Sequence, residues 1–258
     1  SLMAIDKLPH SLLVIGGRAV ALELGQAFAR LGVSVTILQR SERLVPGHEP
    51  EIGEALGDIL RAERLVVHTG VELNEIYAED GQKVISADIQ GVSQDFKAEQ
   101  ILVGVGRTPN TQALGLTALG VETDENGFII VDDHLQTSNP RIYAAGDVTT
   151  LPEFVYVAAA AGGMAAENAL LGNQEKLDLS ILPSVIFSDP QIASVGLTEA
   201  QARQQGFNTA ISELPLNHVP RALAARQTDG LIKLVADKDT DRLLGAHILA
   251  VEAGEMIQ

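Results

Sequence analysis

The 258-residue sequence contains no cysteine. It therefore brings no disulfide framework, no thiolate metal ligand and no thiol nucleophile of its own. The six histidines are scattered without the spacing of metal ligands, so we expect no metal site and interpret them as solvent-facing or singly hydrogen-bonded. The missing cysteines and the lack of a signal-peptide pattern at the N-terminus favour a cytoplasmic location.

Basic residues are also scarce. The sequence has 18 Lys and Arg against 34 Asp and Glu, which gives a net charge of −16. Such a charge repels phosphate backbones, so we expect no nucleic-acid partner. No apolar run reaches the ~18 residues of a membrane helix, so we expect no membrane partner either. With 46% hydrophobic and 20% charged residues, the composition is typical of a globular protein of one or two domains.

The first forty residues have the pattern of a β-α-β unit. The mostly apolar run 11–15 predicts a strand buried on both faces of a parallel sheet. Glycines follow it, then a helix that ends at Gly32, then a strand at 33–38. The apolar positions of that helix predict a single buried face formed by Val20, Leu24, Ala27, Phe28 and Leu31.

The rest of the chain predicts further alternation of helices and strands. A second helix begins near Pro50, where Glu49 and Glu51 complement the helix dipole, and its apolar face is Ile52, Ala55, Leu56, Ile59 and Leu60. Strands are expected at 65–68, 71–77, 83–89, 95–99, 101–105, 128–131, 141–145, 184–187, 193–195, 231–235 and 243–249. Helices are expected at 157–170 and 199–205.

The turn after the first strand is a candidate dinucleotide site. In such folds the first glycine permits a tight turn, the second lets the backbone approach the pyrophosphate, and a third small residue lets helix and strand pack closely. Gly16 and Ala21 fit the first and third roles, with Gly17 between them, but Arg18 stands where the second glycine is usual. Arg18 either clashes with a bound pyrophosphate or swings aside and pairs with it. The alternative is a β-α-β turn that binds no nucleotide.

The end of the second strand indicates which dinucleotide is bound. An NAD site places an acid there to accept from the ribose hydroxyls. This sequence has Arg40 and Arg43 instead, and arginine matches the geometry of a 2′-phosphate. We therefore predict NADPH rather than NADH, with Arg40 as the primary contact and Arg43 as the second. The alternative is two solvated arginines near Glu42.

Several longer motifs resemble one enzyme family. They are Gly104–Asn110 (GVGRTPN), Thr137–Asp147 with its YAAGD ending, and Asp189–Gly196 (DPQIASVG). Their order is that of the flavin-dependent pyridine nucleotide-disulfide oxidoreductases. Within that family, three further segments are most similar to the mercuric reductases: 154–162, 219–224 and 252–258. The resemblance covers the chain from Asp6 onward.

The resemblance implies an α/β chain with three parts. These are a Rossmann-like NAD(P)H-binding domain (1–110), the C-terminal part of an FAD-binding domain (111–176) and the start of an α+β dimerisation domain (177–258). It also implies NADPH and FAD as cofactors, a homodimer, and Hg(II) or a disulfide as substrate. The implied NADPH contacts are Gly16, Gly17, Arg18, Ala21, Glu23, Arg40, Arg43 and Gly106, and the implied FAD contacts are Gly146, Asp147 and Val155.

The sequence departs from the family pattern in two ways. Ala19 stands where many members carry a tyrosine that covers the flavin. The family's redox cysteine pair is absent, so no catalytic residue is assigned and the chain is expected to be a fragment that is inactive alone. Two alternatives stay open: another family member that reduces a disulfide or a low-molecular-weight thiol compound, and a non-catalytic module that binds NADPH.

Overall fold

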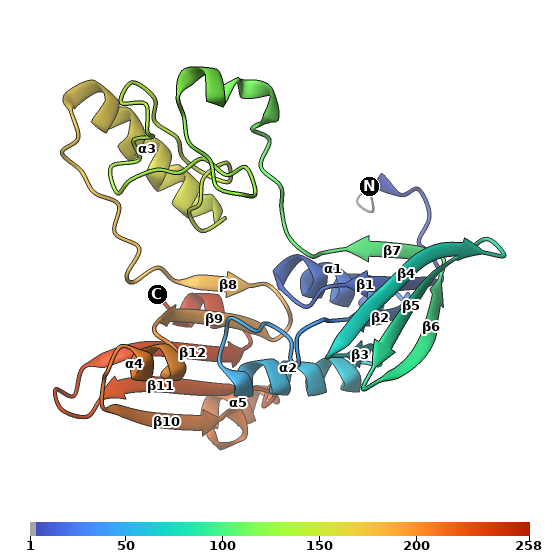
Figure 1. Cartoon of the computed structure of the whole chain (residues 1–258). Helices are drawn as coiled ribbons and strands as arrows, with labels where there is room; N and C mark the ends of the chain where they lie inside the picture. The colour runs from blue at the N-terminus through green and yellow to red at the C-terminus, as the bar shows by residue number, and fades with distance from the viewer. Residues whose placement is uncertain (1–3) are drawn as a thin grey trace. The chain divides into compact units, whose positions relative to one another are not determined.

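The computed structural model describes residues 4–258, which divide into two compact units (Figure 1). The first unit combines the chain up to Val105 with Leu182–Gln258. The second unit is Gly106–Ile181.

The first unit begins with the predicted β-α-β pattern. Its parallel sheet has the strand order β3-β2-β1-β7, as expected for a Rossmann-like fold. The four strands are β1 (Ser11–Ile15), β2 (Ser34–Leu38), β3 (Val66–His68) and β7 (Gln100–Val103). The crossovers contain the helices α1 (Ala19–Arg30) and α2 (Pro50–Ala62). Proline at the first position of α2 begins the helix where the sequence predicts it.

The buried face of α1 differs from the prediction. Val20 and Leu31 are 43% and 63% exposed, whereas the buried positions are Ala21, Leu22, Gly25, Gln26 and Phe28. The reason is close packing, because the small residues of α1 let the helix approach the sheet. A Cβ at Gly25 would lie within ordinary contact distance of Val14, Val35 and Ile37. Gln26 is buried because its side-chain amide exchanges two hydrogen bonds with the backbone of Asp189.

An antiparallel meander separates β3 from β7. Its strands β4 (Val71–Glu79), β5 (Gln82–Ile89) and β6 (Val92–Ala98) form a three-stranded sheet. The turn between β4 and β5 is at Asp80-Gly81, where both residues have positive φ. An Asp-Gly pair is typical of such short hairpin turns.

The C-terminal part of the first unit is an antiparallel sheet with the order β10-β11-β12-β9-β8. Its strands are β8 (Ser184–Ile186), β9 (Gln191–Gly196), β10 (Thr209–Pro215), β11 (Leu231–Asp237) and β12 (Leu243–Ala250). Three helices accompany it: α4 (Glu199–Gln204), α5 (Pro220–Ala225) and α6 (Ala253–Met256). The sequence analysis missed β10 and α5. Most of β10 is exposed, so it lacks the apolar alternation of a half-buried strand.

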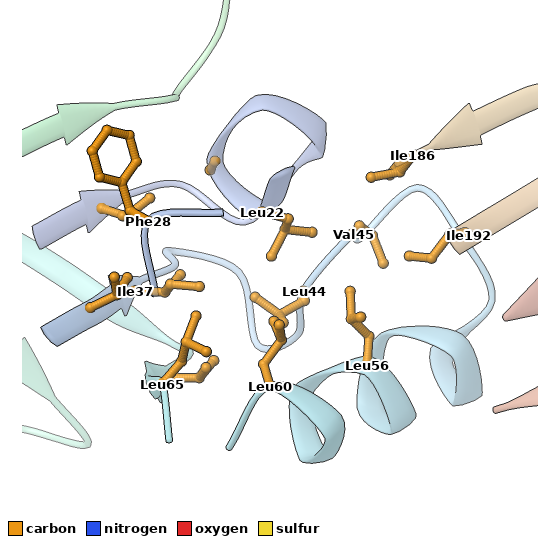
Figure 2. Packing of buried hydrophobic residues seen from close by; sticks show 14 of the residues in the cluster. Leu22, Phe28, Ile37, Leu44, Val45, Leu56, Leu60, Leu65, Ile186 and Ile192 are labelled. Atoms are coloured by element: carbon orange, nitrogen blue, oxygen red, sulfur yellow. The ribbon is translucent and has the colours of Figure 1, made fainter. Parts of the chain in front are cut away.

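One hydrophobic core joins the parallel sheet to the five-stranded antiparallel sheet of the first unit. Ile186 and Ile192 of the antiparallel sheet belong to the same buried cluster as Val45, Leu56 and the residues of β1 and β2. Figure 2 shows the loop carrying Leu44 and Val45 between α2 and these two isoleucines. The helical face predicted for α2 contributes Ile52, Leu56 and Leu60 to this core, with Ala55 and Ile59 partly buried beside it.

The second unit contains little regular structure besides α3 (Val155–Leu171). Two short 3-10 helices precede it, η2 (Gln112–Leu114) and η3 (Leu116–Leu119). The strands predicted at 128–131 and 141–145 are wrong, since these segments make only isolated bridges. Aspartate side chains satisfy part of the backbone near these bridges: Asp124 accepts from Asn126 N and Phe128 N, and Asp132 accepts from His134 N and Gln136 N. Within residues 4–258, no helix is both long and apolar enough to cross a bilayer.

Candidate functional site

A cavity of about 880 Å³ lies at the carboxyl ends of the parallel strands β1, β2 and β7. Open parallel sheets bind ligands at this edge. Its volume is within the range of pockets that hold small molecules and cofactors. The lining residues are Ile15, Gly16, Gly17, Arg18, Leu38, Gln39, Arg40, Ser41, Gly70, Val71, Glu72, Leu73, Gly104 and Val105.

Three small residues, Gly16, Gly104 and Ala21, pack closely together at this cavity. Gly16 has φ of +117°, and a Cβ there would lie 2.4 Å from the carbonyl oxygen of Gly104. A Cβ on Gly104 would lie 3.0 Å from the Cβ of Ala21. Any larger side chain at these positions would therefore push the β1–α1 turn away from β7. The first and third motif positions thus have the roles predicted for them, a tight turn and close helix–strand packing.

The N-terminus of α1 adjoins the cavity, which is lined by the N-cap residue Arg18. The first intrahelical bond runs from Leu22 N to the Arg18 carbonyl, so the N–H groups of the first turn have no partner within the helix. No side chain caps this end. Such an end favours an anion. Arg18 has extended backbone angles, φ −111° and ψ −174°, which any residue adopts, and its exposed side chain lines the cavity.

The segment after β2 also lines the cavity. Gln39 is buried, and its backbone donates to His68 O at 2.9 Å and accepts from Val71 N at 3.0 Å. Arg40 and Ser41 follow it along the cavity. Arg40 is exposed and has no ion pair within residues 4–258, so its guanidinium is available to a ligand. Glu72 is the one acid among the lining residues of this cavity.

Four predicted NADPH contacts, Ala21, Glu23, Arg43 and Gly106, do not line this cavity. Arg43 lines a second, smaller cavity of about 250 Å³ beside α2, and its Nη2 donates to Pro46 O at 3.2 Å. Glu23 accepts a hydrogen bond from the backbone N–H of Phe187 at 2.9 Å. The structure therefore brings together Gly16, Gly17, Arg18 and Arg40, with Ala21 packed beneath them, but not Arg43 or Glu23.

The second unit contains the other predicted site residues. Asp147 accepts from Arg107 Nη1 at 2.6 Å, and the Nε of Arg107 lies 3.6 Å from a carboxylate oxygen of Glu153. About half of the Asp147 side chain stays exposed. Gly146 precedes it with φ of +77°, and a Cβ there would lie 3.3 Å from that of Ala158 on α3.

The N-terminus of α3 is open to a ligand. Val155 begins the helix and is 87% exposed, and no side chain caps this end. The rings of its two sequence neighbours, Phe154 and Tyr156, stack on each other with centroids 5.2 Å apart. Gly106 also belongs to this unit and has φ of +151°.

The sequence analysis missed several lining residues of the large cavity: Gln39, Ser41, Glu72 and Gly104. Gly104 belongs to the GVGRTPN motif, but no role was predicted for it. Its contact with Gly16 spans 88 positions in the chain and leaves no local sequence signal. Glu72 lies on β4 of the meander, and the hydrophobic periodicity of the sequence does not predict where the meander packs against the parallel sheet. Within residues 4–258, no three His, Asp or Glu side chains converge as metal ligands.

Comparison with known proteins identifies the family. The model of the pyridine nucleotide-disulphide oxidoreductases matches residues 2–162, and that of their dimerisation domain matches 182–258. Mercuric reductases from Bacillus cereus and Staphylococcus aureus are each 46% identical over the whole chain. The mercuric reductase of Streptomyces lividans is 47% identical over 99% of it. These matches confirm the resemblance. The chain covers 41%, 47% and 54% of these three relatives, about half their length.

Solved structures confirm the expected fold class. The HOCl-induced flavoprotein disulfide reductase RclA from Escherichia coli matches with a TM-score of 0.87 and 29% identity, covering 99% of this chain and 58% of that one. LpdA from Mycobacterium tuberculosis matches with a TM-score of 0.87 and 25% identity, covering 99% of this chain and 55% of that one. The domain boundaries expected at 110 and 176 stay predictions. The chain belongs to the pyridine nucleotide-disulphide oxidoreductase family, which implies FAD and NAD(P)H as its cofactors.

Proposed function

We propose that this chain is the NADPH-binding and flavin-contacting part of a mercuric reductase. Electrons would pass from NADPH through FAD and a dithiol to Hg(II). The observation that carries the proposal is the large cavity, where a tight glycine turn and a free helix N-terminus lie together with an unpaired Arg40. The 44–47% identity to mercuric reductases, against 25–30% to the similar solved structures, supports this substrate over a disulfide.

The residues of the cavity fit NADPH. The first-turn N–H groups of α1 and the Arg18 guanidinium would bind the pyrophosphate, and Gly16 and Gly17 would let the backbone approach it. Arg40 would bind the 2′-phosphate in a charge-assisted, bidentate manner. Arg43 would join it only after releasing Pro46 O, so we assign Arg40 the larger share.

The second unit fits one edge of a flavin site. Asp147 would accept from hydroxyls of the ribityl chain, and the α3 N-terminus at Val155 would direct N–H groups at the flavin ring. When bound, FAD supplies the electron transfer between NADPH and the dithiol. Arg107 holds the Asp147 carboxylate at 2.6 Å and would orient it for this contact. We assign Gly106 to the neighbourhood of the nicotinamide, on the family resemblance.

The remaining parts of the reaction would lie outside these 258 residues. The chain has no cysteine, so the redox dithiol would come from the intact protein. The matched dimerisation domain, residues 182–258, supports a homodimer. Hg(II) would be held by thiolates, because soft ligands select soft metals.

The test is Hg(II)-dependent oxidation of NADPH by the intact protein with excess external thiol. We expect NADPH consumption that requires Hg(II) and disappears when the redox cysteines of the intact protein are replaced. Activity on a disulfide without activity on Hg(II) would assign the chain to another branch of the family. Binding of NADPH without either activity would leave a non-catalytic NADPH-binding module.

Arg40→Ala is expected to weaken NADPH binding about tenfold to thirtyfold, since it removes a charge-assisted bond worth about 1.5–2 kcal/mol. NADH lacks the 2′-phosphate, so its Kd should stay within about twofold. Calorimetric titration of the chain with both nucleotides measures the difference.

Two control variants sharpen this result. Arg18→Ala should weaken both nucleotides alike, because the pyrophosphate is common to them. Arg242→Ala, an exposed arginine on the β11–β12 turn, should change neither. An equal loss of NADPH and NADH in Arg40→Ala would contradict the 2′-phosphate assignment.

A further inference from the structure

A buried lysine connects the antiparallel sheet to the start of α2. Lys233 of β11 is 1% exposed, and its Nζ donates to three carboxylates. The partners are Glu49 and Glu51 at the start of α2 and Glu199 at the start of α4, with N–O distances of 2.9 Å each. The three donors of the ammonium group are thus used, which a buried lysine requires. The sequence analysis assigned Glu49 and Glu51 to the helix dipole and gave Lys233 no role.

Glu49 is the central partner. It is 2% exposed, and its second carboxylate oxygen accepts from Glu199 N at 2.6 Å and lies 3.7 Å from His247 Nε2. His247 donates from Nε2 to Leu197 O at 3.1 Å, because a carbonyl only accepts. Burial lowers the pKa of His247, which keeps the imidazole neutral beside Lys233. Burial alone would also lower the pKa of Lys233, but its three carboxylate partners raise it above the ordinary value.

The polar groups form one row across the antiparallel sheet. Directly paired positions on its five strands are Glu213, Lys233, His247, Ser194 and Ser184. Apolar residues two positions away on the same strands, such as Ile192, Leu231 and Leu249, pack into the core shared with α2. The row therefore interrupts an otherwise apolar contact. In any other register Lys233 and Glu49 would be buried without each other, which is strongly destabilising.

A short path of backbone contacts leads from Glu49 to the dinucleotide cavity. The Glu49 carbonyl accepts from Ile52 N and Gly53 N in the first turn of α2. Gly53 lies against the preceding loop, since a Cβ there would be 2.5 Å from the carbonyl oxygen of Leu44. The next residue, Val45, donates its N–H to the carbonyl of Gly17 at 2.8 Å. The loop held by Glu49 is thus bonded to the phosphate-binding turn, and it begins at Arg40.

We propose that Lys233 is a positioning residue for the dinucleotide cavity: by holding Glu49 at the start of α2, it fixes the 40–45 loop and, through the Val45–Gly17 hydrogen bond, the phosphate-binding turn. The inference rests on the proposed dinucleotide function of that cavity. Lys233 touches no ligand in this arrangement. The five-stranded antiparallel sheet, through Lys233 of β11, then contributes with the parallel sheet to the affinity for the dinucleotide.

The test replaces Lys233 and measures both binding and local opening. Lys233→Met keeps the length of the side chain and removes its charge. Lys233→Met/Glu49→Gln also removes the most deeply buried carboxylate, so this second variant folds even where the first leaves too many unpaired charges. Lys97→Met is the matched control, because Lys97 pairs with Glu79 at an exposed site on the meander. NADPH and NADH titrations are made at a temperature well below unfolding, and amide hydrogen exchange is measured on the same samples.

We expect both Lys233 variants to bind NADPH and NADH about tenfold more weakly, because the phosphate-binding turn serves both nucleotides. The Val45 amide should exchange about tenfold faster, while Gly16, whose N–H is bonded to Leu38 O, keeps its protection. Lys97→Met should change neither quantity.

A purely structural role gives a different pattern. A lower Tm with unchanged nucleotide affinity and unchanged Val45 exchange in either folded Lys233 variant overturns the inference. If the unmodified chain binds neither nucleotide, the proposed function fails, while the exchange of Val45 against Gly16 still decides whether Lys233 holds the loop.

Discussion

Gly16→Ala is expected to lower the free energy of unfolding by about 3–4 kcal/mol and to abolish dinucleotide binding. Two costs add. The backbone at Gly16 has φ of +117°, which a residue with a Cβ rarely adopts. The new Cβ would also lie 2.4 Å from the carbonyl oxygen of Gly104, so β7 or the β1–α1 turn must shift. Urea unfolding and NADPH titration of the variant measure both effects.

Gly32→Ala is the control for this prediction. Gly32 has φ of +93° after the end of α1, but nothing lies within 4 Å of a Cβ built there. We expect it to cost only about 1 kcal/mol and to leave NADPH binding unchanged. Equal losses in the two variants would show that backbone strain, rather than the contact with Gly104, dominates at Gly16.

Acid is expected to destabilise the chain through His48. Burial is the largest cause that lowers the pKa of His48 from 6.5 to about 4. Between these values the unfolded chain binds a proton that the folded chain does not, so stability falls as the pH falls from about 6.5 to 4. Above pH 6.5 the histidine contributes no such dependence. The full cost at pH 4 is about 3 kcal/mol.

His48→Asn should remove most of that acid-dependent loss. An asparagine side chain can still reach the Ser194 hydroxyl, which lies 3.4 Å from His48 Nδ1. Urea unfolding at several pH values between 7 and 4 gives the slope for each variant. His218→Asn, which replaces an exposed histidine, should keep the slope of the unmodified chain. An unchanged slope in His48→Asn would assign the acid sensitivity to other groups.

Local patterns predicted most elements of the first unit. β1 begins and ends as predicted, and α2 starts at Pro50, because a proline and an apolar stripe act within a few residues. The tight turn at Gly16 and the close helix–strand packing at Ala21 were also predictable, since both depend on the local spacing of small residues. The buried face of α1 was not, because apolar periodicity gives no weight to the small residues Ala21 and Gly25 that contact the sheet.

Long-range polar contacts account for the rest. Lys233 meets Glu49 across 184 positions, and nothing near either residue indicates a buried ion pair. Arg43 was predicted as the second 2′-phosphate contact, but its Nη2 donates to Pro46 O and the residue lines the smaller cavity. In the second unit, the Asp124 side chain accepts from the N–H of Phe128, a backbone group that the pattern assigned to a strand ladder. Such contacts depend on which segments meet, which a pattern read along one chain does not contain.

The first unit is built from two segments that are far apart in the chain, so it cannot complete its fold until the second segment has been synthesised. The core around Val45 and Leu56 is completed by Ile192, Leu231 and Leu249, and Leu249 follows Val45 by about 200 residues. At ribosomal rates of about 5–20 residues per second, the apolar side chains beside α2 stay exposed to solvent for about 10–40 s before the residues that cover them are synthesised. Glu49 likewise has no Lys233 to pair with until β11 is synthesised. A nascent chain arrested before β11 should therefore be a better chaperone substrate than one released after β12.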